Sequence, residues 1–147
     1  MTENLVEVHH LNKYFHEGRP DEVHAIDDVS FNIQRGEVFG LVGESGSGKT
    51  TTGRCILNLY QPTSGDIIYD GEDVTKLKGR QKLKEFHQKT SMIFQDPYSS
   101  LDPRMSVRDI IAEGLKIHQK TTNREEFDEK VAETMKLVGL TPDLMNR

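Results

Sequence analysis

The chain of 147 residues has no tryptophan and a single cysteine, Cys55, so an internal disulfide is excluded. The absence of disulfides fits a reducing compartment. No apolar run approaches the ~20 residues that are needed to span a bilayer. The N-terminal segment MTENLVEVHHL lacks the charged start and apolar middle of a signal peptide. The sequence therefore predicts a soluble intracellular protein, long enough for one domain with a core.

Excess positive charge is also missing, because the formal net charge is −5. We therefore do not expect the chain to bind nucleic acid or an anionic membrane through its overall charge. The six histidines have no metal-ligand spacing with one another or with Cys55, so we expect no metal site built from them. The basic stretch 76–89 is interpreted as a solvated helix or loop face rather than an anionic contact surface.

Segments rich in β-forming residues predict strands. We expect these strands at 5–15, at 23–33 and at 66–74, the last with Asp70-Gly71 as its turn. Residues 37–43, EVFGLVG, are almost continuously apolar, which predicts a strand buried on both faces, as in a parallel sheet. Residues 90–95, TSMIFQ, predict a short apolar strand.

Apolar residues at helical spacing predict helices. We expect them at 50–60, 105–118 and 124–140. Ser106 is expected to cap the second helix, and Gly139 to end the third. The apolar stripes of the last two helices predict packing in a core rather than contact with a cofactor.

Residues 43–51 read GESGSGKTT, which fits the pattern G-x-x-x-x-G-K-[ST] at Gly43, Gly48, Lys49 and Thr50. Glycines permit a close backbone approach, amide groups converge on phosphate oxygens, and the following helix adds its positive end. Lys49 supplies a charge for the β- and γ-phosphates, Thr50 a hydroxyl for Mg²⁺, and Thr51 can reach the α-phosphate. A plain turn has no use for a lysine followed by three threonines, so the motif predicts a phosphate-binding loop.

The loop alone leaves kinases, GTPases, motors and transporters open. The guanine-reading pattern N-K-x-D fails, because Asn12-Lys13 continues as Tyr14-Phe15, and D-x-x-G does not occur in the sequence. A small nucleoside kinase would place its loop nearer the N-terminus, without two strands before it. These features argue against a GTPase and a nucleoside kinase.

The segment VSFNIQRGEVFGLVGESGSGKTTTGRCILNLYQPTSGDIIYDGEDV, at 29–74, resembles the ATP-binding subunits of ABC transporters almost throughout. IFQDPYSSLDPRMSV, at 93–107, is similar to the Q-loop of that superfamily and the segment after it. FQDP followed by SSLDPR resembles the oligopeptide and dipeptide importer branch, in particular its F-type ATPase subunit. Phe15 is placed where these proteins keep an aromatic residue that stacks on adenine. The resemblance covers the whole chain, with specific motifs in the middle and a less specific tail at 116–147.

The resemblance implies an α/β P-loop NTPase core of the RecA-like type, with an antiparallel β subdomain and the start of an α-helical subdomain. Residues 1–95 would form the nucleotide-binding core with the β subdomain. Residues 96–147 would hold the segment after the Q-loop and the beginning of the helical subdomain.

The resemblance also assigns roles to individual residues. Phe15 would stack on adenine, with Tyr14 as second choice, and strand alternation allows only one of them to face the nucleotide. A core position for either ring stays open. Lys49 and Gln95 would serve catalysis, and Thr50 and Gln95 would reach Mg²⁺. The residues that would surround the triphosphate of ATP are Gly43, Glu44, Ser45, Gly46, Ser47, Gly48, Lys49, Thr50 and Thr51.

For the parent protein, the resemblance implies an ATPase that drives peptide import from the cytoplasmic face of the membrane, as a peripheral subunit. The implied partners are a second ATPase subunit, permease subunits docking between Asp96 and Val107 and, indirectly, an extracellular substrate-binding protein. Nucleic acid is not an expected partner. The transported substrate stays open between oligopeptide, dipeptide, nickel and glutathione.

The family's LSGGQ-like signature, its strand ending in Asp-Glu and its switch histidine do not occur in these residues. We therefore expect the chain to be the N-terminal half of a longer protein and to hydrolyse no ATP alone. One alternative is a nucleotide-binding module that works without hydrolysis. The other is a nucleic-acid-associated ABC ATPase, suggested by the basic stretch 76–89 alone.

Overall fold

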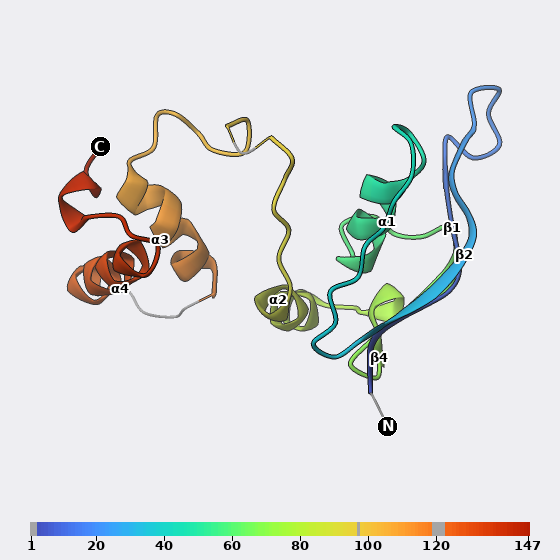
Figure 1. Ribbon diagram of the computed structural model, residues 1–147, viewed down its shortest axis with the longest axis horizontal. Helices are drawn as coiled ribbons and strands as arrows, with labels where there is room; N and C mark the ends of the chain where they lie inside the picture. Colours follow the sequence, from blue (N-terminus) through green and yellow to red (C-terminus); the bar gives the residue numbers. More distant parts are fainter. Residues whose placement is uncertain (1–2, 97, 119–122) are drawn as a thin grey trace. The chain divides into compact units, whose positions relative to one another are not determined.

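The structure, a computed structural model, describes residues 3–96, 98–118 and 123–147. The chain divides into two compact units, Met1–Ser91 and Met92–Arg147, and each has a core of its own. Figure 1 shows the elements of both units in chain order. Within the described ranges, no helix has the length and apolar character needed to cross a membrane.

A four-stranded antiparallel sheet forms the frame of the first unit. Its strands are β1 (Asn4–Phe15), β2 (Val23–Gln34), β3 (Ser64–Tyr69) and β4 (Glu72–Asp73), in the order β2-β1-β3-β4. The strands predicted at 5–15, 23–33 and 66–74 are therefore confirmed, including the turn between β3 and β4. This sheet positions the loop that follows β2.

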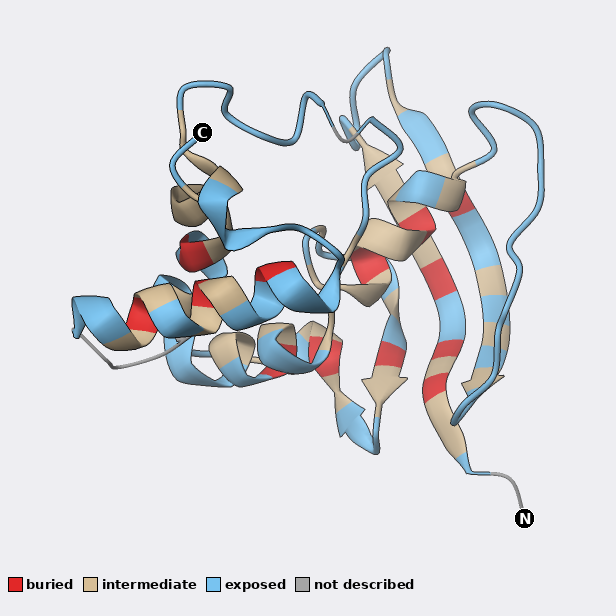
Figure 2. Ribbon diagram, turned by 60° about the vertical axis from the view of Figure 1, so that its left-hand side comes forward, coloured by how far each residue is buried: buried red, intermediate tan, exposed pale blue. Residues whose placement is uncertain are grey.

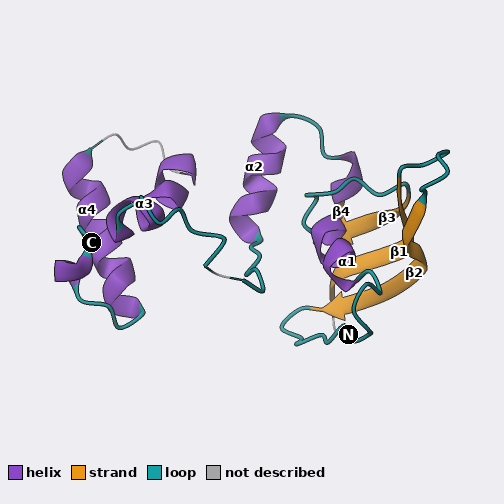
Figure 3. Cartoon of the chain, turned by 90° about the horizontal axis from the view of Figure 1, so that it is seen from above, coloured by secondary structure: helices purple, strands orange, loops and turns teal. Residues whose placement is uncertain are grey.

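The apolar face of the sheet packs against α1 (Lys49–Ile56), as the burial colouring of Figure 2 and the view in Figure 3 show. Val8, Leu11 and Ile67 of the sheet are fully buried there. Cys55 of α1 belongs to the same core, and burial raises the pKa of its thiol against the opposing charge of Lys13. The helix expected at 50–60 is thus confirmed, although it ends earlier.

Two short helical segments complete the first unit. The 3₁₀ helix η1 (Val74–Lys76) follows β4, and α2 (Arg80–Lys89) lies after it. Val74 and Phe86 are buried in the core of the sheet. The lysines of the stretch 76–89 lie mainly on the exposed side, as expected for a solvated face.

The second unit is built around α3 (Val107–His118) and α4 (Arg124–Leu137), followed by the 3₁₀ helix η2 (Pro142–Leu144). Its core residues are Ala112, Val131 and Met135. The predicted caps are confirmed: the Oγ of Ser106 accepts a hydrogen bond from the amide of Asp109 at 3.2 Å, and Gly139 has a φ of 78°. The apolar spacing at 124–140 includes Val138 among the residues expected to be buried, but Val138 is exposed.

Two predicted strands are wrong. Residues 37–43 and 90–95 form extended loops, in which Val38 is 98% exposed, Val42 92% and Ile93 94%. A strand buried on both faces depends on hydrogen-bonded neighbours along its edges. Among the described residues neither segment is paired in a sheet, so the backbone stays in contact with water.

The pairing of β1 with β3 requires a glycine at one point. β1 is irregular around His9 and His10, and its pairing with β3 changes register between His9 and Asn12. Gly65 lies against this irregularity with a φ of 90°, and a Cβ at Gly65 would be 2.3 Å from the carbonyl oxygen of His10. Only glycine avoids that overlap.

We expect Gly65→Ala to destabilise the first unit more than Gly71→Ala, which is the matched control. Gly71 also has a positive φ, but a Cβ there would meet nothing within 4 Å. The control should lose about 1–2 kcal/mol from backbone strain. Gly65→Ala should lose about 1–3 kcal/mol more, because the backbone of β1 must shift. Urea unfolding followed by circular dichroism measures both, and equal losses would contradict the close contact.

Candidate nucleotide-binding site

The loop at 43–48 rests on the beginning of β2 through a glycine. Gly48 precedes α1 with a φ of 87°, in the left-handed region. A Cβ at Gly48 would lie 2.1 Å from the carbonyl oxygen of Ala25, so any larger residue would push the loop away from β2. The sequence motif required a glycine here, and the structure gives the contact that requires it.

The side chain of Lys49 folds back and hydrogen bonds to residues of this loop. Its Nζ donates hydrogen bonds to the carbonyl oxygens of Gly43 at 2.8 Å and Glu44 at 2.5 Å, and to the Oγ of Ser47 at 3.2 Å. These partners are neutral oxygens, and no carboxylate in the described part of the chain forms an ion pair with Lys49. The positive charge of the ammonium group is therefore not neutralised by the protein.

The start of α1 adds further positive potential. Its N-cap is Gly48, which offers no side-chain hydrogen bond, and its first turn contains no acidic residue. The first amide N–H groups of a helix have no partner inside the helix, and they carry the positive end of the helix dipole. Such a helix start binds anions.

A hollow of about 190 Å³ opens at this point. It is lined by Val23, His24, Ala25, Gly46, Ser47, Gly48, Lys49, Thr50 and Thr51. The hydroxyls of Thr50 and Thr51 form no hydrogen bond with any residue that the structure describes. Thr52 differs, because its Oγ1 donates to the carbonyl of Gly48 at 3.0 Å. Two of the three threonines thus keep hydroxyls that a ligand can use.

Not every predicted loop residue lines the hollow. Gly43 and Glu44 lie outside its lining and contribute their carbonyl oxygens to Lys49 instead. Ser45 also lies outside the lining and is exposed. The three residues Val23, His24 and Ala25 line it without having been predicted, because the loop contacts the start of β2, which no local sequence pattern indicates.

Phe15 lies on the side of the sheet that carries α1. It pairs with Val23, which lines the hollow. The edge of its ring packs against Tyr60 at a centroid distance of 5.6 Å, and the Nζ of Lys13 lies 5.0 Å from its ring centroid. The position of Phe15 is therefore close in the sheet to the phosphate loop.

Tyr14 is engaged in other contacts. Its ring stacks on His24 at 3.9 Å with an interplanar angle of 18°, and its hydroxyl donates to Asp27 at 3.0 Å. The hydrogen bond to the Asp27 carboxylate, followed by desolvation and nearby negative charges, raises the pKa of Tyr14. Since neighbouring residues of a strand point to opposite faces, the side chains of Tyr14 and Phe15 lie on opposite faces of the sheet.

Gln95 belongs to the second unit, whereas the phosphate loop belongs to the first. It lies exposed at a bend rather than at the end of a strand. Directly after it, the carboxylate of Asp96 accepts backbone hydrogen bonds from Tyr98 at 3.1 Å and from Ser99 at 3.3 Å, which shapes the following turn. Residue 97, within the predicted permease-docking segment, lies outside the described residues.

The fold defines the class of this protein. The chain is similar to a dimeric, post-hydrolysis structure of the ATP-binding cassette MJ0796 bound to ADP and Pi. The TM-score is 0.80 at 25% identity, over 97% of this chain and 60% of that chain. The predicted α/β P-loop NTPase class is therefore confirmed, although its parallel strands do not form among the described residues.

The chain belongs to the ABC transporter family, because the sequence model of that family matches residues 26–147. It is 55% identical over 150 residues to the oligopeptide transport ATP-binding protein OppF of Streptococcus mutans, covering all of this chain and 48% of that protein. It is 48% identical over 151 residues to the dipeptide transport ATP-binding protein DppF of Lactococcus lactis, again covering 48% of the relative. The chain thus spans about half the length of these relatives, and the predicted resemblance is confirmed.

Proposed function

We propose that this chain is the nucleotide-binding part of an ATPase subunit of a peptide importer, which binds ATP with Mg²⁺ and couples hydrolysis to the uptake of oligopeptides or dipeptides. The observation that carries the proposal is the loop closed by Lys49 at the start of α1, in a member of the ABC transporter family. The names of the relatives, which refer to oligopeptide and dipeptide transport, support the substrate class.

The loop fits a triphosphate by its charge and its backbone. Lys49 is held by two carbonyl oxygens and one hydroxyl, all of them neutral. Charge-assisted hydrogen bonds to phosphate oxygens are stronger than bonds to neutral oxygens, so a phosphate group competes well for the ammonium. The amides at the start of α1 and the backbone from Gly43 to Thr51 would bind the remaining phosphate oxygens.

Mg²⁺ fits the donors that this site offers. Thr50 lines the hollow beside Lys49, and its hydroxyl is not used by any described residue. Hydroxyl, amide and phosphate oxygens suit this hard cation. When bound, Mg²⁺ neutralises charge on the β- and γ-phosphates. Thr50 would hold the ion, and Gln95 would contribute its amide oxygen and orient the attacking water.

Phe15 is the proposed base-stacking residue. Its ring lies on the face of the sheet that carries α1, whereas the pairing partners of both Phe15 and Tyr14, Val23 and His24, line the hollow. Tyr14 already stacks on His24 and hydrogen bonds to Asp27. These contacts favour Phe15 over Tyr14 for adenine.

The proposed assembly has two ATPase subunits at the cytoplasmic face of the membrane, bound to permease subunits. The permease would dock between Asp96 and Val107, and an extracellular substrate-binding protein would deliver the peptide. Residues 1–95 would bind nucleotide, and 96–147 would begin the helical subdomain. The net charge of −5 argues against nucleic acid as a partner.

The coupling to peptide uptake is tested on the full-length protein reconstituted with a peptide permease in proteoliposomes. We expect phosphate release to rise when the substrate-binding protein carries a peptide, because transport and hydrolysis are coupled. Nickel or glutathione in place of the peptide distinguishes the substrates of related importers. Hydrolysis that is independent of the permease and of every substrate would refute the transport role.

We expect Lys49→Ala to weaken binding of ATP with Mg²⁺ by at least about tenfold, since hydrogen bonds to charged groups contribute about 1.5–3 kcal/mol each. Isothermal titration calorimetry measures the affinity of the variant and of the unchanged protein for ATP with Mg²⁺. Lys78→Ala is the matched control, because Lys78 is an exposed lysine of the same unit outside the hollow. Equal affinities in Lys49→Ala and the parent protein would refute the assignment of the loop.

Phe15→Ala should weaken ATP binding by several-fold, because base stacking on an aromatic ring contributes about 1–3 kcal/mol. Inorganic triphosphate, which has no base, should bind the parent and Phe15→Ala alike. The variant Tyr14→Ala, at the neighbouring position, shows whether Tyr14 contacts adenine instead of Phe15. A loss in Tyr14→Ala without a loss in Phe15→Ala would assign the adenine contact to the other face of β1.

A further inference from the structure

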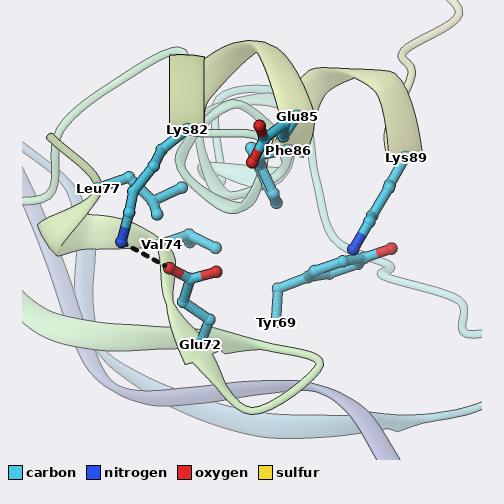
Figure 4. Close-up of a pocket in the computed structure, with 8 residues that line it drawn as sticks. All are labelled: Tyr69, Glu72, Val74, Leu77, Lys82, Glu85, Phe86 and Lys89. Atoms are coloured by element: carbon cyan, nitrogen blue, oxygen red, sulfur yellow. Dashed lines mark hydrogen bonds and ion pairs between the residues drawn. The ribbon is translucent and has the colours of Figure 1, made fainter. Parts of the chain in front are cut away.

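The first unit has a second hollow, of about 300 Å³, whose lining shares no residue with the phosphate loop. It lies between the β3–β4 hairpin, η1 and α2 (Figure 4). Its volume is at the lower end of the range of small-molecule pockets. It is lined by Tyr69, Glu72, Val74, Leu77, Lys82, Glu85, Phe86 and Lys89.

One stripe of α2 forms a wall of this hollow. The helix contributes Lys82, Glu85, Phe86 and Lys89. Their spacing of three, four and seven residues from Lys82 places them on one face of the helix. The apolar member packs into the core, while the charged members lie around it. The face is thus apolar at its base and charged at its edge.

The base of the hollow is apolar and well packed. Val74 and Phe86 belong to the buried core, and Leu77 packs against it. The ring of Tyr69 meets the ring of Phe86 edge-on at 5.4 Å. Tyr69 and Leu77 are partly exposed, so an apolar side chain of a ligand would meet mainly one aromatic and one aliphatic group here.

The rim carries two lysines and two glutamates, so its formal charge is zero. Lys82 and Glu72 form an ion pair at 3.5 Å, both with exposed side chains, which contributes little. Glu85 accepts a hydrogen bond from Gln81 at 2.7 Å. Lys89 forms no hydrogen bond or ion pair within the part of the chain that the structure describes, and Figure 4 shows it directed toward Tyr69.

We propose that this hollow binds a small zwitterion with an apolar side chain, namely a free α-amino acid such as leucine or phenylalanine. The ammonium group of the ligand would pair with Glu85 or Glu72, and its carboxylate with Lys89 or Lys82. A simple anion would also meet the two glutamates, and a simple cation the two lysines. Only a ligand with both charges is attracted by the whole rim, while its side chain covers the apolar base. The inference is independent of the nucleotide site.

The ligand class is tested on the unchanged protein by NMR titration with L-leucine, leucinamide and N-acetyl-leucine. Leucinamide lacks the carboxylate, and N-acetyl-leucine lacks the ammonium charge. We expect leucine to shift amide signals of α2 and the β3–β4 hairpin, and each analogue to bind at least about tenfold more weakly, because it loses charge-assisted hydrogen bonds. Absence of leucine binding, or equal binding of all three compounds, would overturn the proposal.

Variants then assign the charges. Lys89→Gln and Glu85→Gln should each weaken leucine binding by about tenfold, because each removes one charged partner of the zwitterion. Lys84→Gln lies on the same helix outside the lining and is the matched control. Circular dichroism confirms that the variants fold. Unchanged leucine binding in both pocket variants, or an equal loss in the control, would place the ligand elsewhere and refute the site.

Discussion

The position of the phosphate loop depends on the approach of Gly48 to the carbonyl oxygen of Ala25. Ala25 precedes Ile26, which is buried in the core of the sheet, so the backbone on which the loop rests is fixed by packing. Burying a side chain such as Ile26 or Leu11 contributes about 1.5–3 kcal/mol. The core therefore stabilises a platform, the glycine allows the loop to touch it, and the contact determines where Lys49 and the start of α1 lie.

The elements with one buried face could be predicted from the sequence, since their pattern of apolar residues reflects a single neighbouring layer. This holds for β1, β2, the β3–β4 hairpin, α3 and α4. The segments 37–43 and 90–95 could not be predicted in the same way. Their apolar residues indicate burial on both faces, which depends on strands elsewhere in the chain, and a pattern within one segment carries no information about whether such neighbours pair with it.

In the candidate site, too, residues of one local motif could be predicted from the sequence, whereas residues brought together by the fold could not. The motif indicated Lys49 and Thr50, because the spacing of its glycines and its lysine is a property of one loop. Val23 and Ala25 were missed, since they line the hollow only because the loop packs against the start of β2, some twenty residues earlier in the chain. The choice between Tyr14 and Phe15 likewise required the register, because alternation shows that the two rings differ without showing which one faces α1.

The hollow beside Lys49 and the hollow beside α2 differ in charge, and this difference favours different ligands. Lys49 is held by neutral oxygens only, and the first turn of α1 has no acid, so a cation and the positive end of a helix meet at the loop. Lys82 and Lys89 share their hollow with Glu72 and Glu85, which cancel the charge of the rim. A chain with a net charge of −5 can therefore still attract a polyphosphate at one point, because the charged groups around that point act on the ligand at short range.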